Sequence, residues 1–214
     1  MSISFQQIHQ ISIDAAWYTQ PFKGFCLDSR KLEAGQIFIA LNSYSQPEKT
    51  RLFAENALNA GALAVISETD LGLANEWVCP EVRYLMGEWQ KQYLQVVDPV
   101  TALRGIAVTG TNGKTTISRL IAELISSQGQ GCAVMGTTGN GILPNLTPST
   151  HTTLDALQLQ NALHDYAKQV ASVVALAASS HGLEQGRLNG CELEIAVYSN
   201  LSRDHLDYHG TLEA

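Results

Sequence analysis

The segment Ile106-Ala-Val-Thr-Gly-Thr-Asn-Gly-Lys-Thr-Thr116 decides the fold class of this chain. Its first four residues predict a buried strand, and the periodic apolar residues from Lys114 to Ser127 predict a helix. Gly110 and Gly113 permit backbone angles that turn successive N–H groups towards one concavity, where the helix start adds its positive end. The alternative is a Gly-rich turn with a solvated lysine, but the order strand, loop, helix favours a phosphate-binding loop.

Within this loop, the side chains following the second glycine suit a nucleotide. The ammonium group of Lys114 would reach the β- and γ-phosphates, and the Thr115 hydroxyl would ligate Mg²⁺. Val108 stands where the usual pattern has its first glycine. The sequence therefore predicts a nucleotide site that departs from the commonest form of the motif.

Strands and helices alternate along the rest of the chain. Apolar runs predict strands at 35–41, 62–67, 132–135, 172–178 and 195–199, and helical spacing predicts helices at 50–60, 87–97 and 154–169. Such alternation predicts an α/β protein with a mainly parallel sheet covered on both faces. Because Asp98-Pro99 interrupts the pattern, we expect an N-terminal α/β domain at 1–98 and a nucleotide-binding domain at 99–214.

Composition excludes several classes of protein. Of the 214 residues, 45% are hydrophobic and 15% are charged, as in a globular protein. A net charge of −7 argues against nucleic acid as a partner. No signal peptide and no membrane-spanning stretch are recognised, so we expect a cytoplasmic protein without membrane insertion. The four cysteines form no CxxC pair, which favours free thiols over a zinc site.

Two polar runs follow predicted strands in the second half of the chain, at 179–187 and 199–210. Ligands of an open parallel sheet bind beyond the carboxyl ends of its strands, so both runs should face the phosphate loop. His205 stands beside Asp204, Asp207 and His209. This grouping favours a metal or phosphate role for His205 over a structural one.

Several of these segments resemble the Mur ligases in order and spacing. They are Gly110–Thr116, Gly136-Thr-Thr-Gly139, Thr152-Thr153, Ser179-Ser-His-Gly-Leu183 and Asn200-Leu-Ser-Arg-Asp-His-Leu-Asp-Tyr-His-Gly210. Leu27-Asp-Ser-Arg30 with 35–41 resembles the N-terminal domain with which E- and F-type members hold a UDP-sugar. The run from Asn200 is typical of the E type, which adds the third peptide residue.

The resemblance implies a reaction and a set of site residues. ATP phosphorylates the carboxylate of a UDP-MurNAc-dipeptide. The amine of a diamino acid then attacks the acyl phosphate, and the overall resemblance favours meso-2,6-diaminopimelate as this amino acid. Lys114 and His205 are the implied catalytic residues, and Thr115 and His205 the implied magnesium ligands. ATP is assigned to Gly110, Thr111, Asn112, Gly113, Lys114, Thr115 and Thr116. The substrate is assigned to Leu27, Ser29, Tyr44, Ser45 and Gln46 at its uridine end, and to Thr152, Thr153, Ser179, Gln185 and Arg187 along its sugar and peptide.

Three features depart from the family. Ala177 stands where the family has a glutamate that binds magnesium, which should weaken the metal site. The segment 42–49 lacks the family's glycines. The family's modified lysine and its C-terminal domain would lie beyond Ala214, so we expect this chain by itself to be inactive.

Other interpretations remain open. A nucleotide-binding module without ligase activity is one, and a lysine-adding or folylpolyglutamate-type ligase is another. Asp28-Ser29-Arg30 and the run 204–207 disfavour the folylpolyglutamate type. In each case we expect a monomer.

Overall fold

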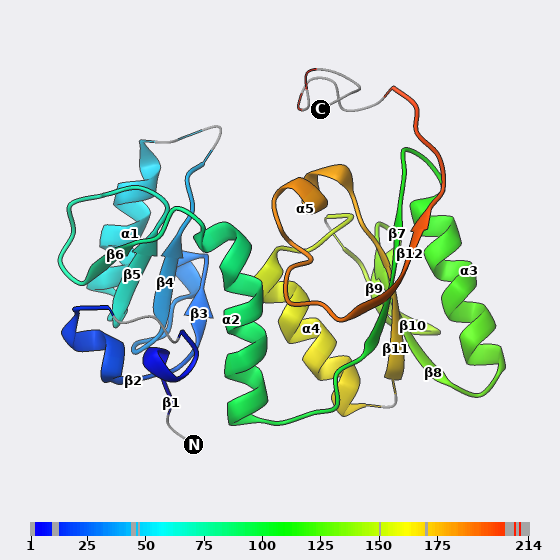
Figure 1. The fold of residues 1–214 in the computed structure, drawn as a ribbon, viewed down its shortest axis with the longest axis horizontal. Coiled ribbons are helices and arrows are strands. Elements are labelled where there is room, and N and C mark those ends of the chain that lie inside the picture. Colours follow the sequence, from blue (N-terminus) through cyan, green and yellow to red (C-terminus); the bar gives the residue numbers. More distant parts are fainter. Residues whose placement is uncertain are drawn as a thin grey trace. The chain divides into compact units, whose positions relative to one another are not determined.

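The computed structural model describes residues 3–9, 13–43, 46, 48–149, 151–169, 171–203, 208 and 210. The chain divides into two compact units, Met1–Pro99 and Val100–Ala214 (Figure 1). The division falls one residue after the break at Asp98-Pro99.

The N-terminal unit is built on a parallel sheet of four strands. Their order is β3 (Phe25–Cys26), β4 (Ile37–Ala40), β5 (Ala64–Ser67) and β6 (Glu76–Val78). The helices are α1 (Lys49–Asn59) and α2 (Val82–Val97), with short 3-10 helices at Phe5–Gln7, Ala16–Thr19 and Ser29–Lys31. A separate antiparallel pair joins β1 (Ile3–Ser4) to β2 (Pro21–Phe22). The helix expected at 87–97 thus begins five residues earlier, at Val82, because Gly87 is a buried interior residue of α2 rather than its start.

Aromatic side chains fill much of the core of this unit. Phe5 is fully buried, and its ring centroid lies 5.0 Å from that of Trp89 and 5.8 Å from that of Phe25. His9 stacks on Phe5 at 5.4 Å, and burial lowers the pKa of its imidazole. His9 is therefore a neutral core residue.

The C-terminal unit contains a six-stranded sheet in the order β10-β9-β8-β11-β7-β12. Its strands are β7 (Arg104–Thr109), β8 (Gly131–Gly136), β9 (Gly139–Ile142), β10 (Asn145–Thr147), β11 (Ala171–Ala177) and β12 (Leu193–Tyr198). Strands β8, β11, β7 and β12 are parallel, whereas β9 and β10 form an antiparallel hairpin that was not expected. The helices are α3 (Lys114–Ser127), α4 (Ala156–Lys168) and the short α5 (Ser180–Glu184).

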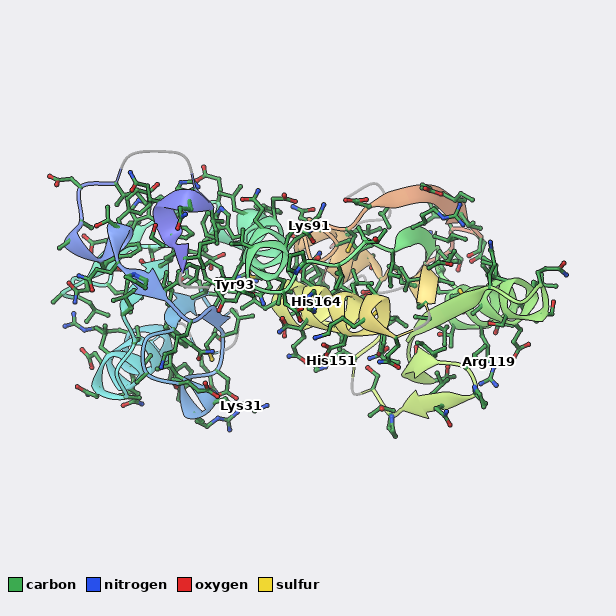
Figure 2. The ribbon with its side chains drawn as sticks, turned by 90° about the horizontal axis from the view of Figure 1, so that it is seen from below. Lys31, Lys91, Tyr93, Arg119, His151 and His164 are labelled. Carbon is green, nitrogen blue, oxygen red and sulfur yellow. The ribbon has the colours of Figure 1, made fainter. Side chains whose placement is uncertain are left out.

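Alternate side chains of the central strands enter two separate cores. Cys132 and Val134 pack in one core with Ala122 of α3, and Ala133 and Met135 pack in the other with Leu159 of α4. A strand with both faces buried must be apolar at every position, which explains the continuous apolar runs. Figure 2 shows Arg119 extending from α3, where it forms an ion pair with Glu123 at 2.9 Å, and the buried His164 on α4.

The edge strand β12 differs from this pattern. Ile195 is 51% exposed and Tyr198 is 62% exposed, although both were expected to be covered on each face. Within the described part of the sheet, β12 is an edge strand with β7 as its single neighbour. No described helix is long and apolar enough to cross a membrane.

Candidate functional site

The loop that the sequence predicts to bind phosphate lies between the end of β7 and the start of α3, as its strand, loop and helix order predicts. Gly110 has φ +131° and Gly113 has φ +87°, both in the region that favours glycine. The backbone N–H groups of Gly113, Lys114, Thr115 and Thr116 donate to no residue that the structure describes. Four consecutive free N–H groups at a helix start form a site suited to an anion.

The first half of the loop differs from expectation. The Thr111 N–H donates to the Asn200 carbonyl at 2.9 Å, and the Asn112 N–H donates to Asn200 Oδ1 at 3.1 Å. These two N–H groups are therefore directed at β12's continuation rather than towards a phosphate. The run of free donors within the described residues therefore begins at Gly113, in the second half of the loop.

Lys114 is held by the loop itself. Its Nζ donates to the Gly110 carbonyl at 2.6 Å and to the Thr111 carbonyl at 3.0 Å. Three N–H bonds are available on an ammonium group, so these two contacts leave one for another acceptor. The lysine thus lies at the loop, within reach of any anion bound to the free N–H groups.

The region expected to hold magnesium has few oxygen ligands. Thr115 Oγ1 lies 3.0 Å from Thr137 Oγ1. A Cβ placed on Gly136 would lie 3.3 Å from the Ala177 Cβ and 4.0 Å from Thr115 Oγ1, so position 177 faces the same spot as the Thr115 hydroxyl. Alanine supplies no oxygen there, and the described residues contain no cluster of His, Cys, Asp or Glu that could hold a metal.

These residues fit a magnesium ion only in part. Mg²⁺ requires hard oxygen ligands, generally one or two carboxylates together with phosphate oxygens. The described side chains offer hydroxyls alone. His205, the other expected ligand, lies outside the described residues.

A second polar network lies at the end of β11. Thr153 Oγ1 donates to the Ala177 carbonyl at 3.0 Å and accepts the Ser179 N–H at 3.0 Å. The Ser179 side chain then caps α5 by accepting the Gly182 N–H at 3.1 Å. Thr153 and Ser179, expected from sequence to line one substrate, are thus in direct contact, and the half-buried Thr152 adjoins them.

Arg187 is also part of this network. Its Nη1 donates to the Thr153 carbonyl at 2.8 Å, and Nε and Nη2 both donate to Gln185 Oε1, at 3.0 and 2.6 Å. The Gln185 amide in turn donates to the Tyr208 hydroxyl at 2.9 Å. With three N–H groups used, the guanidinium retains two for an outside acceptor.

The N-terminal unit has a hollow at the residues expected to bind uridine. It has a volume of about 440 Å³ and is lined by Leu27, Asp28, Ser29, Arg30 and Phe53. A smaller hollow of about 210 Å³ shares Leu27 and Phe53 and also includes Thr50. The Thr50 hydroxyl is buried and without a partner among the described residues, which leaves it available to a ligand.

The remaining uridine candidates lie elsewhere or outside the description. The Gln46 N–H donates to Ser43 Oγ at 3.1 Å, and Gln46 does not line either hollow. Tyr44 and Ser45 lie outside the described residues.

Sequence reasoning did not assign a role to several residues that the structure places at these sites. Thr50 and Phe53 belong to α1, which the sequence predicted as a helix at 50–60 without a binding role for either residue. Ser199 and Asn200 belong to a polar run that was recognised, but nothing in the sequence showed that they contact the phosphate loop. The one indication in the sequence was that these two polar residues directly follow a predicted strand.

Comparison with known proteins agrees with this geometry. The family model for the Mur ligase middle domain matches residues 108–214. The proteins named UDP-N-acetylmuramoyl-L-alanyl-D-glutamate--2,6-diaminopimelate ligase from Vibrio cholerae and Ralstonia nicotianae are 43% and 42% identical, each over 198 residues. These matches cover 88% and 86% of this chain but 39% and 37% of the relatives. The chain thus spans about two fifths of the length of these relatives.

Solved structures give the same result. A structure described by the same ligase name is 80% identical, with a TM-score of 0.94, and the match covers 100% of this chain and 43% of that one. A MurF ligase from Thermotoga maritima in complex with ADP is 18% identical with a TM-score of 0.56, covering 89% of this chain and 40% of that one, which shows the fold alone. Since the middle-domain model matches half of the chain, this chain belongs to the Mur ligase family.

Proposed function

We propose that this chain is the substrate- and nucleotide-binding part of an ATP-dependent amide ligase. The reaction is the addition of meso-2,6-diaminopimelate to UDP-N-acetylmuramoyl-L-alanyl-D-glutamate in peptidoglycan synthesis, through an acyl phosphate. The observation that carries the proposal is the row of free N–H groups from Gly113 to Thr116 beside Lys114, in a chain 80% identical to a structure of that ligase name.

The phosphate loop would bind the triphosphate of ATP. Free N–H groups at the start of α3 donate to phosphate oxygens, and Lys114 exchanges a loop carbonyl for a phosphate oxygen. Such a transfer requires positioning and charge neutralisation rather than an enzyme nucleophile. The nucleotide-binding half of the reaction therefore rests on described residues.

Magnesium would be held mainly by the nucleotide. The Thr115 hydroxyl and His205 are the proposed protein ligands, and the bound ion would neutralise phosphate charge. Because Ala177 provides no carboxylate at this spot, we expect this chain to bind the ion more weakly than a member with glutamate there.

Each unit, taken by itself, has residues that suit one portion of the UDP-MurNAc-dipeptide. In the C-terminal unit, Arg187 would use its two unengaged N–H groups on a carboxylate, while Thr152, Thr153, Ser179 and Gln185 line the sugar and peptide. In the N-terminal unit, the hollow of about 440 Å³ beside Leu27 and Ser29 would hold the uridine. Phe53, which is 42% exposed, offers a ring face to the base.

The amino acid and the cellular location are parts of the same proposal. The names of the relatives favour diaminopimelate over lysine and do not favour a folylpolyglutamate-type reaction. None of the four cysteines forms a disulfide, which is in keeping with reaction in a reducing cytoplasm. We propose a monomer.

A nucleotide-binding module without ligase activity is the second candidate. Ala177 favours it, because the missing carboxylate removes a metal ligand from the position that faces Thr115. This candidate predicts ATP binding without phosphate release in any longer form of the protein.

The test of nucleotide binding is Lys114→Ala, measured by calorimetry with ATP. A hydrogen bond to a charged group contributes on the order of 1.5–3 kcal/mol, so affinity should fall about tenfold to a hundredfold. Arg119→Ala is the matched control, because it removes one cation from the same helix at an exposed ion pair. Equal affinities of the wild type and folded Lys114→Ala would contradict the assignment of the phosphate loop.

A further inference from the structure

The first half of the phosphate loop is bonded to the segment that follows β12. The parallel pairing of β7 with β12 ends at Thr109 and Tyr198, but two further main-chain bonds continue it. The Ser199 N–H donates to the Thr109 carbonyl at 2.9 Å, and the Thr111 N–H donates to the Asn200 carbonyl at 2.9 Å. The loop therefore begins as an extension of the sheet.

Side chains strengthen this connection at Asn112. The Asn200 amide makes a reciprocal pair, since its Oδ1 accepts the Asn112 N–H at 3.1 Å and its Nδ2 donates to the Asn112 carbonyl at 2.9 Å. Ser199 Oγ donates to the same carbonyl at 2.7 Å. The main-chain N–H and the carbonyl of Asn112 thus both have hydrogen-bond partners in Ser199 and Asn200.

Thr111 is bound from this segment in the same manner. Its Oγ1 donates to the Ser202 carbonyl at 3.1 Å and accepts the Ser202 N–H at 2.8 Å. The close approach requires glycine at position 110, because a Cβ there would lie 2.7 Å from the Asn200 carbonyl oxygen and 2.9 Å from its nitrogen. These contacts fix the loop up to Asn112 and end where its free N–H groups begin.

We propose that Asn200, assisted by Ser199, is a positioning residue for the nucleotide. It holds Thr111 and Asn112 against the end of β12, so that the following N–H groups from Gly113 to Thr116 converge on one anion before ATP arrives. A binding site arranged in advance avoids the entropy cost of ordering the loop on binding. Asn200 itself does not touch the phosphates. The proposal rests on the proposed function, in that it assumes ATP as the ligand of this loop.

The test is amide exchange with solvent, measured by NMR on the nucleotide-free chain carrying Asn200→Ala. The acceptor for the Asn112 N–H is the Asn200 side chain, whereas the acceptor for the Thr111 N–H is its main chain. We therefore expect Asn112 exchange to accelerate about tenfold, the equivalent of one hydrogen bond, while Thr111 exchange changes much less. A general loss of structure would accelerate both. Asn145→Ala, at an exposed position of β10, is the control and should change neither.

The second measurement is ATP affinity of the same variants. Asn200→Ala should weaken ATP binding about threefold to tenfold with Lys114 intact, by releasing the first half of the loop. Ser199→Ala removes one donor to the Asn112 carbonyl and should weaken ATP binding by a smaller factor. If Asn200→Ala does not fold, Ser199→Ala replaces it in both measurements.

The outcomes separate the two proposals. Selective acceleration at Asn112 together with weaker ATP binding supports the positioning role. Unchanged Asn112 exchange, or accelerated exchange with unchanged ATP affinity, overturns it. Failure of the wild type to bind ATP contradicts the proposed function and the positioning role alike, whereas the exchange data still test whether Asn200 holds the loop.

Discussion

Substitution of Gly110 by alanine tests the close contact between the phosphate loop and the segment after β12. The added methyl group would lie 2.7 Å from the Asn200 carbonyl oxygen and closer still to Ser199 Oγ. The backbone at Gly110 also has φ +131°, which residues with a side chain rarely adopt. Both the steric contact and the backbone conformation should destabilise the C-terminal unit.

The two effects can be separated by a second glycine. Gly129, just beyond α3, has φ +79°, and a Cβ there would have nothing within 4 Å. Gly129→Ala therefore carries only the backbone cost, on the order of 1–2 kcal/mol. Gly110→Ala carries backbone strain of about 1–3 kcal/mol. The added methyl group also displaces the Ser199 hydroxyl, whose single proton is shared between the Thr109 and Asn112 carbonyls, so the loss is that of one hydrogen bond, about 1 kcal/mol. We expect Gly110→Ala to be the more destabilising by about 1 kcal/mol.

Urea denaturation followed by circular dichroism measures this difference. For a unit of this size, a denaturant slope of about 1–3 kcal/mol/M converts this free-energy difference into a midpoint shift of roughly 0.5 M relative to Gly129→Ala. Tryptophan fluorescence gives a separate signal, because all three tryptophans, at positions 17, 77 and 89, belong to the N-terminal unit. If the two glycine variants unfold at the same urea concentration, the proximity of Gly110 to the β12 segment has no energetic consequence and the reasoning fails.

Three further predictions concern the metal, the pH dependence and the N-terminal unit. Ala177→Glu should strengthen magnesium-dependent ATP binding about tenfold and restore phosphate release in a longer form, while Ala177→Gln should not; equal behaviour of both would show that position 177 is not a metal position. The Arg30 hydrogen bond lowers the pKa of Asp28 to about 2 from 3.8, so its stabilising contribution is complete above pH 4 and is lost as the pH falls towards 2. Arg30→Gln should return the Asp28 pKa towards 3.8 in an NMR titration, and an unchanged pKa would contradict the ion pair. UDP added to labelled residues 1–98 should shift the Ser29 amide, and a folded unit without shifts there would remove the uridine assignment.

Much of the C-terminal unit follows from local pattern. The apolar runs of β7, β8, β11 and β12 and the helix from Lys114 to Ser127 were predicted close to their observed bounds. A strand buried on both faces must be apolar throughout, so its signal is strong. The hairpin of β9 and β10 was not predicted, because Gly139 and Gly141 interrupt any apolar run there. The short strands β3 and β6 were missed because two or three residues are too few to show an alternating or continuous apolar pattern.

The candidate site was predicted less completely than the fold. Sequence alone proposed a phosphate loop at Gly110–Thr116, singled out the polar runs after β11 and β12, and showed that Ala177 supplies no carboxylate. It could not show that Thr153, Ser179 and Arg187 bond to one another, because each lies on a separate segment of the chain.

The sequence by itself determined which residues can form strands, helices and a phosphate loop, since glycines, apolar period and a lysine at a helix start act over a few neighbouring positions. The tertiary structure decided how the loop is used. Parallel pairing of β7 with β12 brings Asn200 to Asn112, 88 positions away in the chain, and occupies two N–H groups that local geometry had assigned to phosphate. Contacts between residues so far apart depend on strand order and register, which no local pattern specifies.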